Sequence, residues 1–145
     1  MGNMRPAADS YTYDVGIGSA SAIRERTANI LRSFGYQLLR DDGNERVYME
    51  TQWQKRAPVD GQERMRGGEI ISRVQISGSP RVVAGGPTLY HALVTIENRF
   101  VPTHGTQREA RETQPSLSYV QSIVKGMSVA LGSTARPVAN DPRPF

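Results

Sequence analysis

Residues 21–53 read SAIRERTANILRSFGYQLLRDDGNERVYMETQW, and this stretch decides the fold. In its first half the apolar residues recur at the spacing of a helix, and arginines occupy the other faces. Gly35 follows the last periodic residue, where a left-handed residue ends many helices, and Tyr36 can close over Leu31. We therefore predict a helix that ends at Gly35. Its apolar face would comprise Ile23, Thr27, Ile30, Leu31 and Phe34.

The pattern then changes from a helical one to an alternating one. Residues 36–40 are a short apolar strand candidate, and the turn sequence DDGN at residues 41–44 should reverse the chain. Beyond the turn, the apolar residues alternate with polar ones up to the single tryptophan, Trp53. We predict a hairpin in a sheet that is covered on one side only. Trp53 is in phase with the buried face, which predicts a core anchor or a rim residue beside the next loop.

Three further patterned segments follow a polar stretch. The polar residues 54–68 are expected to form a long loop. In residues 69–77 and 88–100 two sets of side chains alternate, and this pattern predicts two more strands. Pro115 is well placed in the first turn of a second helix, and Gly132 is a second candidate for a helix end. The apolar positions of this second helix are Leu117, Val120, Ile123, Val124, Met127 and Leu131.

Two apolar-faced helices need a common surface to bury them, and the sheet provides one. We predict an α+β fold, a two-layer sandwich in which an antiparallel sheet of three to four strands carries the N-terminal and C-terminal helices on one face. Residues 19–132 would form this single domain. Residues 1–18 would be an extended lead-in, with an added edge strand as an option, and residues 133–145 a flexible tail.

Composition limits the classes of function. A chain of 145 residues with 37% hydrophobic residues has the size of one domain that needs no metal or disulfide to fold. The absence of cysteine excludes disulfides, thiolate nucleophiles and cysteine-based zinc sites, but fits both a reducing cytosol and an exported protein. The net charge of +4 comes almost entirely from arginines, which are scattered along the chain. No apolar run approaches the roughly 18 to 20 residues of a membrane-spanning helix.

No catalytic constellation is visible. His91, His104 and Glu97 could form a metal site, but no ligand spacing supports it, and a strand histidine and a loop histidine are the simpler interpretation. Glu109 and Glu112 lie among arginines in a polar segment, without the desolvation that separates the pKa values of an acid and a base. The serines lack the surroundings of an activated nucleophile. We therefore expect a protein that is not an enzyme and that holds no metal or cofactor.

A family resemblance starts from the same decisive stretch. The helix end at Leu31, Gly35 and Tyr36, the turn with Asp42, and the strand that ends in Trp53 resemble the helix–hairpin opening of small envelope lipoprotein domains of the BamC type. The resemblance covers about the first third of the patterned region. It implies a periplasm-facing accessory module that braces a multiprotein assembly and performs no chemistry. The family anchors itself through a lipidated cysteine, which would have to lie upstream of this chain.

Three hypotheses for function follow. The first is a non-enzymatic envelope or assembly module that binds protein partners through the open sheet face, a strand edge, the loop at 54–68 or the tails, with the cytoplasm as the alternative location and self-association left open. The second is a nucleic-acid-binding domain that uses loop arginines, against which acidic strand residues weigh. The third is a helix-grip domain with a ligand between the sheet and the C-terminal helix. The candidate partner-binding residues are Tyr48, Trp53, Arg56, Arg64, Arg66, Arg143 and Phe145.

Overall fold

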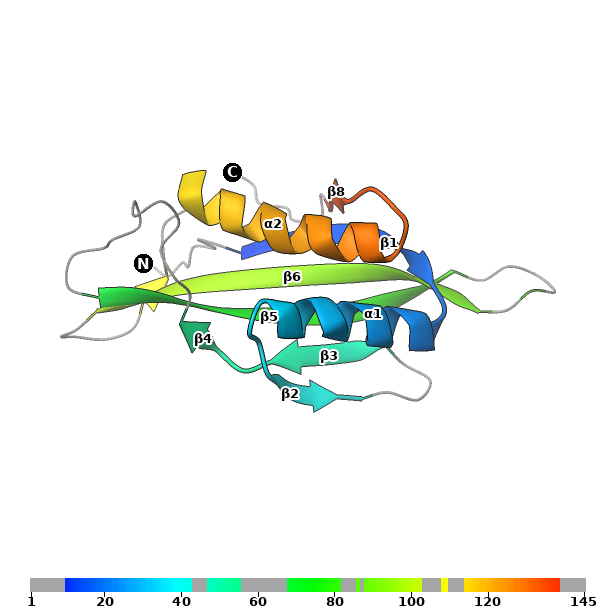
Figure 1. Cartoon of the computed structure of the whole chain (residues 1–145), viewed down its shortest axis with the longest axis horizontal. Helices are drawn as coiled ribbons and strands as arrows, with labels where there is room; N and C mark the ends of the chain where they lie inside the picture. Colours follow the sequence, from blue (N-terminus) through cyan, green and yellow to red (C-terminus); the bar gives the residue numbers. More distant parts are fainter. Residues whose placement is uncertain are drawn as a thin grey trace, which may run out of the picture.

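The computed structural model describes residues 10–42, 47–55, 68–81, 86, 88–102, 108–109 and 114–138. Two helices and eight strands lie in this part of the chain, and Figure 1 shows their arrangement. The helices are α1 (Ala20–Ser33) and α2 (Gln114–Ala130). The strands are β1 (Ser10–Gly18), β2 (Leu38–Asp41), β3 (Tyr48–Thr51), β4 (Gln54–Lys55), β5 (Gly68–Arg81), β6 (Leu89–Pro102), β7 (Arg108–Glu109) and β8 (Arg136–Pro137).

The strands form one antiparallel sheet that is larger than predicted. The order is β2-β3-β5-β6-β1-β8, while β4 pairs with β5 and β7 pairs with β6. The class, α+β with an antiparallel sheet and two helices, agrees with the prediction, but the strand count of three to four was wrong. Neither helix is terminal, because β1 precedes α1 and β8 follows α2.

Strand β1 is the main addition. It pairs with β6 from Ser10 opposite Glu97 to Gly18 opposite Tyr90, and it lies between β6 and β8 rather than at an edge. An irregularity between Asp14 and Gly16 interrupts its alternation, and the Gly16 amide donates to the Asp14 carboxylate (3.0 Å). Such a bulge hides the period of two that would identify a strand from sequence. The segment read as an extended lead-in therefore contributes a nine-residue strand, beyond which, in the described part of the chain, only the two-residue β8 pairs.

Helix α1 begins and ends as its sequence predicts. The Ser19 side chain accepts a hydrogen bond from the Ala22 amide (3.1 Å), which satisfies one free donor of the first turn. At the other end Gly35 has φ +88°, and the Tyr36 amide donates to the Leu31 carbonyl (2.9 Å). This is the Schellman geometry, so the predicted helix end is confirmed.

Helix α2 ends in the same way. Gly132 has φ +71°, and the Ser133 amide donates to the Ser128 carbonyl (2.8 Å). The predicted stop at Gly132 is therefore confirmed. The chain then returns to the sheet as β8, where the Val138 amide donates to the Thr12 carbonyl of β1 (3.0 Å). Residues 139–145, the end of the predicted tail, lie outside the described residues.

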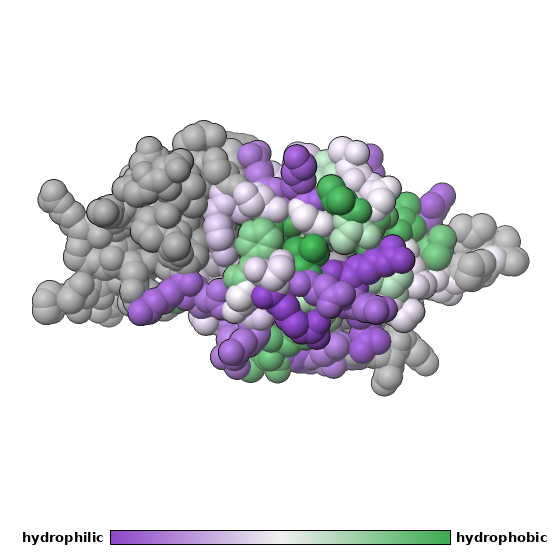
Figure 2. Space-filling view, viewed as in Figure 1, coloured by the Kyte–Doolittle hydropathy of each residue, from purple (hydrophilic) through white to green (hydrophobic). Residues whose placement is uncertain are grey.

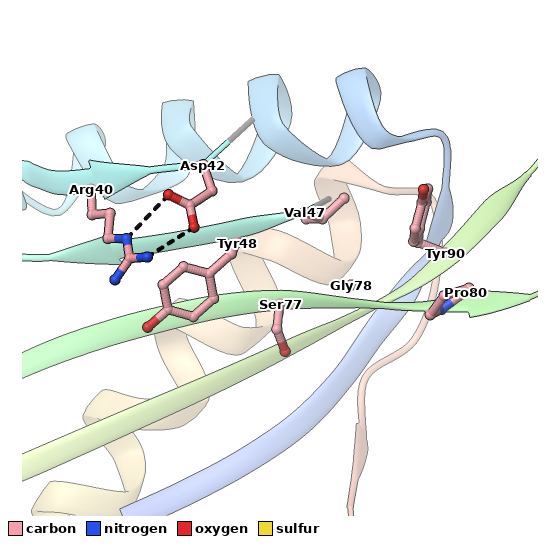
Figure 3. A pocket seen from close by; sticks show the side chains of 8 residues that line it. All are labelled: Arg40, Asp42, Val47, Tyr48, Ser77, Gly78, Pro80 and Tyr90. Atoms are coloured by element: carbon pink, nitrogen blue, oxygen red, sulfur yellow. Dashed lines mark hydrogen bonds and ion pairs between the residues drawn. The ribbon is translucent and has the colours of Figure 1, made fainter. Parts of the chain in front are cut away.

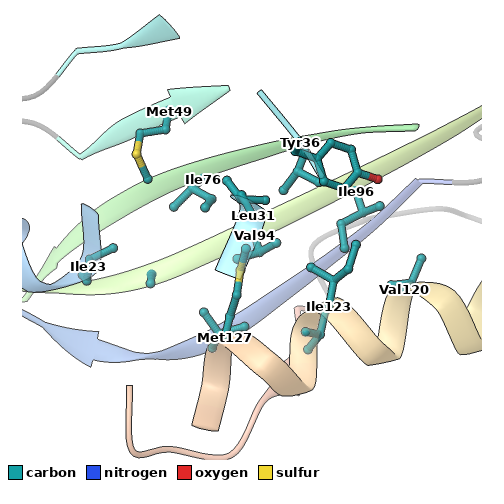
Figure 4. Close-up of a cluster of buried hydrophobic side chains, with 14 of the residues drawn as sticks. Ile23, Leu31, Tyr36, Met49, Ile76, Val94, Ile96, Val120, Ile123 and Met127 are labelled. Carbon is teal, nitrogen blue, oxygen red and sulfur yellow. The ribbon is translucent and has the colours of Figure 1, made fainter. Parts of the chain in front are cut away.

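The core joins both helices to one side of the central strands (Figure 4). Alternate residues of β5 and β6 supply its sheet side, and the apolar stripe of each helix supplies the other. Seen from the direction of Figure 1, hydrophilic residues cover most of the surface over α1, whereas hydrophobic residues show over α2 (Figure 2). The buried apolar cluster comprises Val15, Ile23, Leu31, Tyr36, Val47, Met49, Val74, Ile76, Ala92, Val94, Ile96, Val120, Ile123, Val124 and Met127.

Candidate partner-binding face of the sheet

The side of the sheet that points away from the core is polar and half-exposed. On β5 the buried residues Ser72, Val74 and Ile76 alternate with residues of intermediate exposure, and β6 shows the same alternation. Because successive side chains of a strand point to opposite faces, the intermediate set forms one surface, which we call the outer face. On the two long strands it comprises Ile71, Arg73, Gln75, Ser77, His91, Leu93, Thr95, Glu97 and Arg99.

Trp53 belongs to this outer face and not to the core, so the phase argument that put it in line with the buried residues was wrong. Glu50 lies opposite Gln75, but Gln54 lies opposite Ser72. Four steps along β3 and β4 thus match three steps along β5. The extra residue inverts the alternation between the two short strands, as a β-bulge does.

Hydrogen bonds hold the chain in this shifted register. The Thr51 hydroxyl accepts from the Val74 amide (3.0 Å) and donates to the Gln52 carbonyl (2.9 Å), so a side chain replaces a missing ladder bond. The Gln54 amide group donates to the Phe34 carbonyl at the end of α1 (3.2 Å). Gln54 therefore points to the helix side while Trp53 turns outward.

On the outer face two arginines flank the Trp53 ring. The guanidinium carbons of Arg73 and Arg99 lie 4.9 and 5.4 Å from the ring centroid, within the range of cation–π attraction. Arg73 Nε also donates to Glu97 Oε1 (2.6 Å), and these two side chains are only 28% and 27% exposed. We call Trp53, Arg73, Glu97 and Arg99 the Trp53 cluster. Its parts come from the β3–β4 connection, β5 and β6.

A second group surrounds Tyr48 on the same face, further along β5. The Tyr48 hydroxyl donates to Glu50 (2.7 Å) and accepts from Gln75 Nε2 (3.2 Å). The hydrogen bond to the Glu50 carboxylate, with a smaller effect of burial, raises the pKa of Tyr48 above its usual value. The guanidinium carbon of Arg40 lies 5.4 Å from the Tyr48 ring centroid, and both its Nε and Nη2 donate to Asp42 (3.1 Å each).

A hollow of about 540 Å³ opens beside this group (Figure 3). We call it the Tyr48 hollow. It lies where β3 begins and β5 continues toward its end, with Arg40 and Asp42 on one side and Pro80 and Tyr90 on the other. The remaining lining residues are Val47, Tyr48, Ser77 and Gly78.

Of the predicted partner-binding residues, the structure places Tyr48 and Trp53 on one face, at different positions along β5. Arg56, Arg64, Arg66, Arg143 and Phe145 lie outside the described residues. Sequence reasoning did not assign the charged members of the two groups to a binding site, although their strand patterns carried a signal. Five of them occupy the non-core phase of their strands: Arg40, Glu50, Arg73, Glu97 and Arg99.

His91 and Glu97, which were considered as metal ligands, each pair with a different side chain. His91 Nδ1 lies 2.9 Å from Asp14 Oδ2, to which Arg136 also approaches (3.8 Å), while Glu97 pairs with Arg73. His104 lies outside the described residues. Among the residues with assigned structure, no group of three or more His, Cys, Asp or Glu side chains could hold a metal ion.

No family model matches the chain, and no curated protein matches it. Within the described ranges, neither helix combines the length and the apolar character required to cross a bilayer.

Proposed function

We propose that this protein is a non-enzymatic module that binds a protein partner through the outer face of its sheet, with the Trp53 cluster as the anchor. The observation that carries the proposal is the position of Trp53. The bulge turns the ring away from the apolar core and onto a half-exposed surface, between two guanidinium groups. Tryptophan and arginine are the residues whose truncation most often costs binding energy in protein interfaces.

The cluster is organised before any partner arrives. The Arg73 guanidinium group is held both by Glu97 and by the Trp53 ring, so little side-chain freedom remains to be lost on binding. The flat ring and the planar guanidinium groups offer apolar area and hydrogen-bond donors together. A protein surface that presents a ring or a carboxylate would complement this arrangement.

The outer face fits this role better than the β2 edge of the sheet. Strand β2 is short, and its pairing with β3 is irregular between Leu38 and Arg40. The residue between them, Leu39, is 59% exposed, and the charged Arg40 follows it. Short, irregular and charged edge strands disfavour the addition of a further strand. We therefore propose that the partner binds to side chains of the outer face.

Paired charges on this face weigh against the nucleic-acid alternative. Arg40 is held by Asp42 and Arg73 by Glu97, so a phosphate backbone would have to displace a carboxylate at each position. A gel-shift titration at low and high salt tests this alternative directly.

For the location we propose the periplasmic side of the cell envelope, on the resemblance of residues 21–53 to lipoprotein domains of the BamC type. Fractionation of cells that express the native gene tests the location independently of the binding face. Recovery of the protein in the cytoplasmic fraction would contradict the proposed envelope location, but it would not affect the proposal that the outer face binds a partner.

Site-specific photo-crosslinking tests the binding face. A benzophenone amino acid replaces Ile71, which lies opposite Arg99 on the outer face, or Glu25, an exposed residue of α1, as the matched control. In native cells we expect a discrete adduct from position 71, none from position 25, and loss of the adduct when Trp53→Ala is added. Failure of position 71 to crosslink, or an adduct that Trp53→Ala leaves undiminished, would overturn the proposal.

A further inference from the structure

The Tyr48 hollow has the size and the lining of a small-ligand site. Its volume of about 540 Å³ lies within the range of roughly 300 to 1,000 Å³ that ligand pockets occupy. Such pockets combine apolar and aromatic walls with a few placed polar groups. Here the rings of Tyr48, Tyr90 and Pro80 provide the walls, and the Arg40–Asp42 pair and Ser77 provide the polar groups.

The polar Arg40–Asp42 pair shares its side of the hollow with the Tyr48 ring. In Figure 3, Arg40, Asp42 and Tyr48 stand on one side, and Pro80 and Tyr90 on the other. Gly78 lies between them, and a side chain there would point toward Val47 and Tyr90 on the core side of the sheet. A ligand that enters the hollow would meet a ring face and a polar group at the same time.

The polar side of the hollow is balanced in charge. Arg40 donates twice to Asp42, so the lining contributes one guanidinium and one carboxylate that compensate each other. Each Asp42 oxygen keeps lone pairs beyond the bond that it accepts, and a guanidinium has five N–H donors in a fixed plane. A donor and an acceptor thus stand side by side in fixed positions.

This arrangement suits neighbouring hydroxyl groups on a ring. A hydroxyl both donates and accepts, so two adjacent hydroxyls can bind the guanidinium and the carboxylate together. A C–H face of the same ring can pack on Tyr48, which lies on the outer face together with Arg40 and Ser77. A phosphate would instead compete with Asp42 for Arg40. A proline-rich segment would use the rings but cover the ion pair without bonding to it.

We propose that the Tyr48 hollow binds a neutral saccharide, with Tyr48 packing against the sugar ring and Arg40, Asp42 and Ser77 bonding its hydroxyls. This site is separate from the Trp53 cluster, so either site can fail its test without the other.

The test is a ¹H–¹⁵N NMR titration of the full chain with maltotetraose and with tetra-N-acetylchitotetraose. At least one sugar should shift the amides of Tyr48, Ser77 and Tyr90 in a saturable way below about 10 mM, a concentration that detects even weak binding. Hexaproline and inorganic phosphate serve as comparison probes. Shifts of these amides by either comparison probe, with no response to the sugars, would overturn the proposal.

A pair of matched variants shows whether the polar side of the hollow does the binding. Arg40→Gln removes one arginine–aspartate pair that lines the hollow, and Arg24→Gln removes a similar pair with Asp41 outside it (3.2 Å). Arg40→Gln should weaken sugar binding about tenfold, as expected for one lost charge-assisted hydrogen bond, while Arg24→Gln leaves it unchanged. The Arg40 and Arg24 side chains are 59% and 33% exposed, so both variants should fold. Equal affinities of the two variants, or no response to either sugar, would refute the site.

Discussion

The side-chain amide of Gln54 donates to the main-chain carbonyl of Phe34 across 3.2 Å, and this bond joins the bulge beside Trp53 to the end of α1. Gly35, next to Phe34, has φ +88°, and a Cβ at that position would lie 3.1 Å from Gln54 Nε2. The helix end therefore needs glycine both for its backbone and for the room that Gln54 occupies. Through this contact the helix termination and the direction of Trp53 depend on each other.

Replacing Gln54 by alanine should lower the free energy of unfolding by about 1 kcal/mol, because one partly buried hydrogen bond is lost and the Phe34 carbonyl loses a donor. Urea denaturation followed by circular dichroism measures the change. Gln52→Ala is the control, since the Gln52 side chain is exposed and its main-chain amide still donates to the Gln37 carbonyl. Equal effects of the two substitutions would contradict the role of Gln54.

Alanine substitutions at two glycines, Gly78 and Gly126, should have different effects on stability. A Cβ on Gly78 would lie 2.7 Å from Val47 Cβ and 3.1 Å from the Tyr90 ring, so strands would have to separate. Gly78→Ala should destabilise by about 2 kcal/mol or more. A Cβ on Gly126 in α2 meets nothing closer than Ile30 Cγ2 at 3.4 Å. Gly126→Ala should be neutral or stabilise by up to about 1 kcal/mol, because alanine favours the helix. Thermal melts of both variants measure the difference, and a stable Gly78→Ala protein would contradict the packing at β5.

Trp53→Ala should lower the free energy of unfolding by far less than the size of the removed side chain suggests. The ring lies on the half-exposed outer face, so the expected loss is about 1 kcal/mol, whereas Met49→Ala in the fully buried core should cost about 2 to 5 kcal/mol. Chemical denaturation of the two variants decides the order. A loss for Trp53→Ala as large as that for Met49→Ala would place the ring in the core, and the proposed binding anchor would be lost with it.

The parts of the fold that could be predicted from sequence are those with an uninterrupted period. Helix α1 and its Gly35 end, helix α2 with Gly132, and the alternation in β5 and β6 all follow from regular spacing. The outward turn of Trp53 could not be predicted in this way, because one extra residue inverts the two faces without changing the composition of the segment. Strand β1 was obscured for the same reason, by the bulge at Asp14. Two-residue strands such as β8 depend on pairing partners that a local pattern does not contain.

Within the candidate site, Tyr48 and Trp53 were predicted to bind a partner, because aromatic residues are conspicuous in a sequence, and Glu97 was considered only as a metal ligand. Their neighbours Arg73 and Glu97 lie 24 positions apart, and it is the β5–β6 register that sets them opposite each other. Non-local pairing of this kind leaves no signal in a single sequence.

The bond between Tyr48 and Glu50 predicts a pH dependence. The pKa of Tyr48 is raised above 10.0 in the folded protein, mainly by the hydrogen bond to the Glu50 carboxylate. The folded state therefore binds the phenolic proton more tightly than the unfolded state does. The stability from this bond is therefore fully present below pH 10 and is lost as the pH rises through the raised pKa. Urea denaturation at pH 8 and at about pH 11 should show that the difference between the natural protein and Tyr48→Phe shrinks at the higher pH. In the Glu50→Gln background the carboxylate that raises the pKa is absent, so the same comparison should lose its pH dependence. A dependence that persists in that background would assign the effect to a group other than the Tyr48–Glu50 pair.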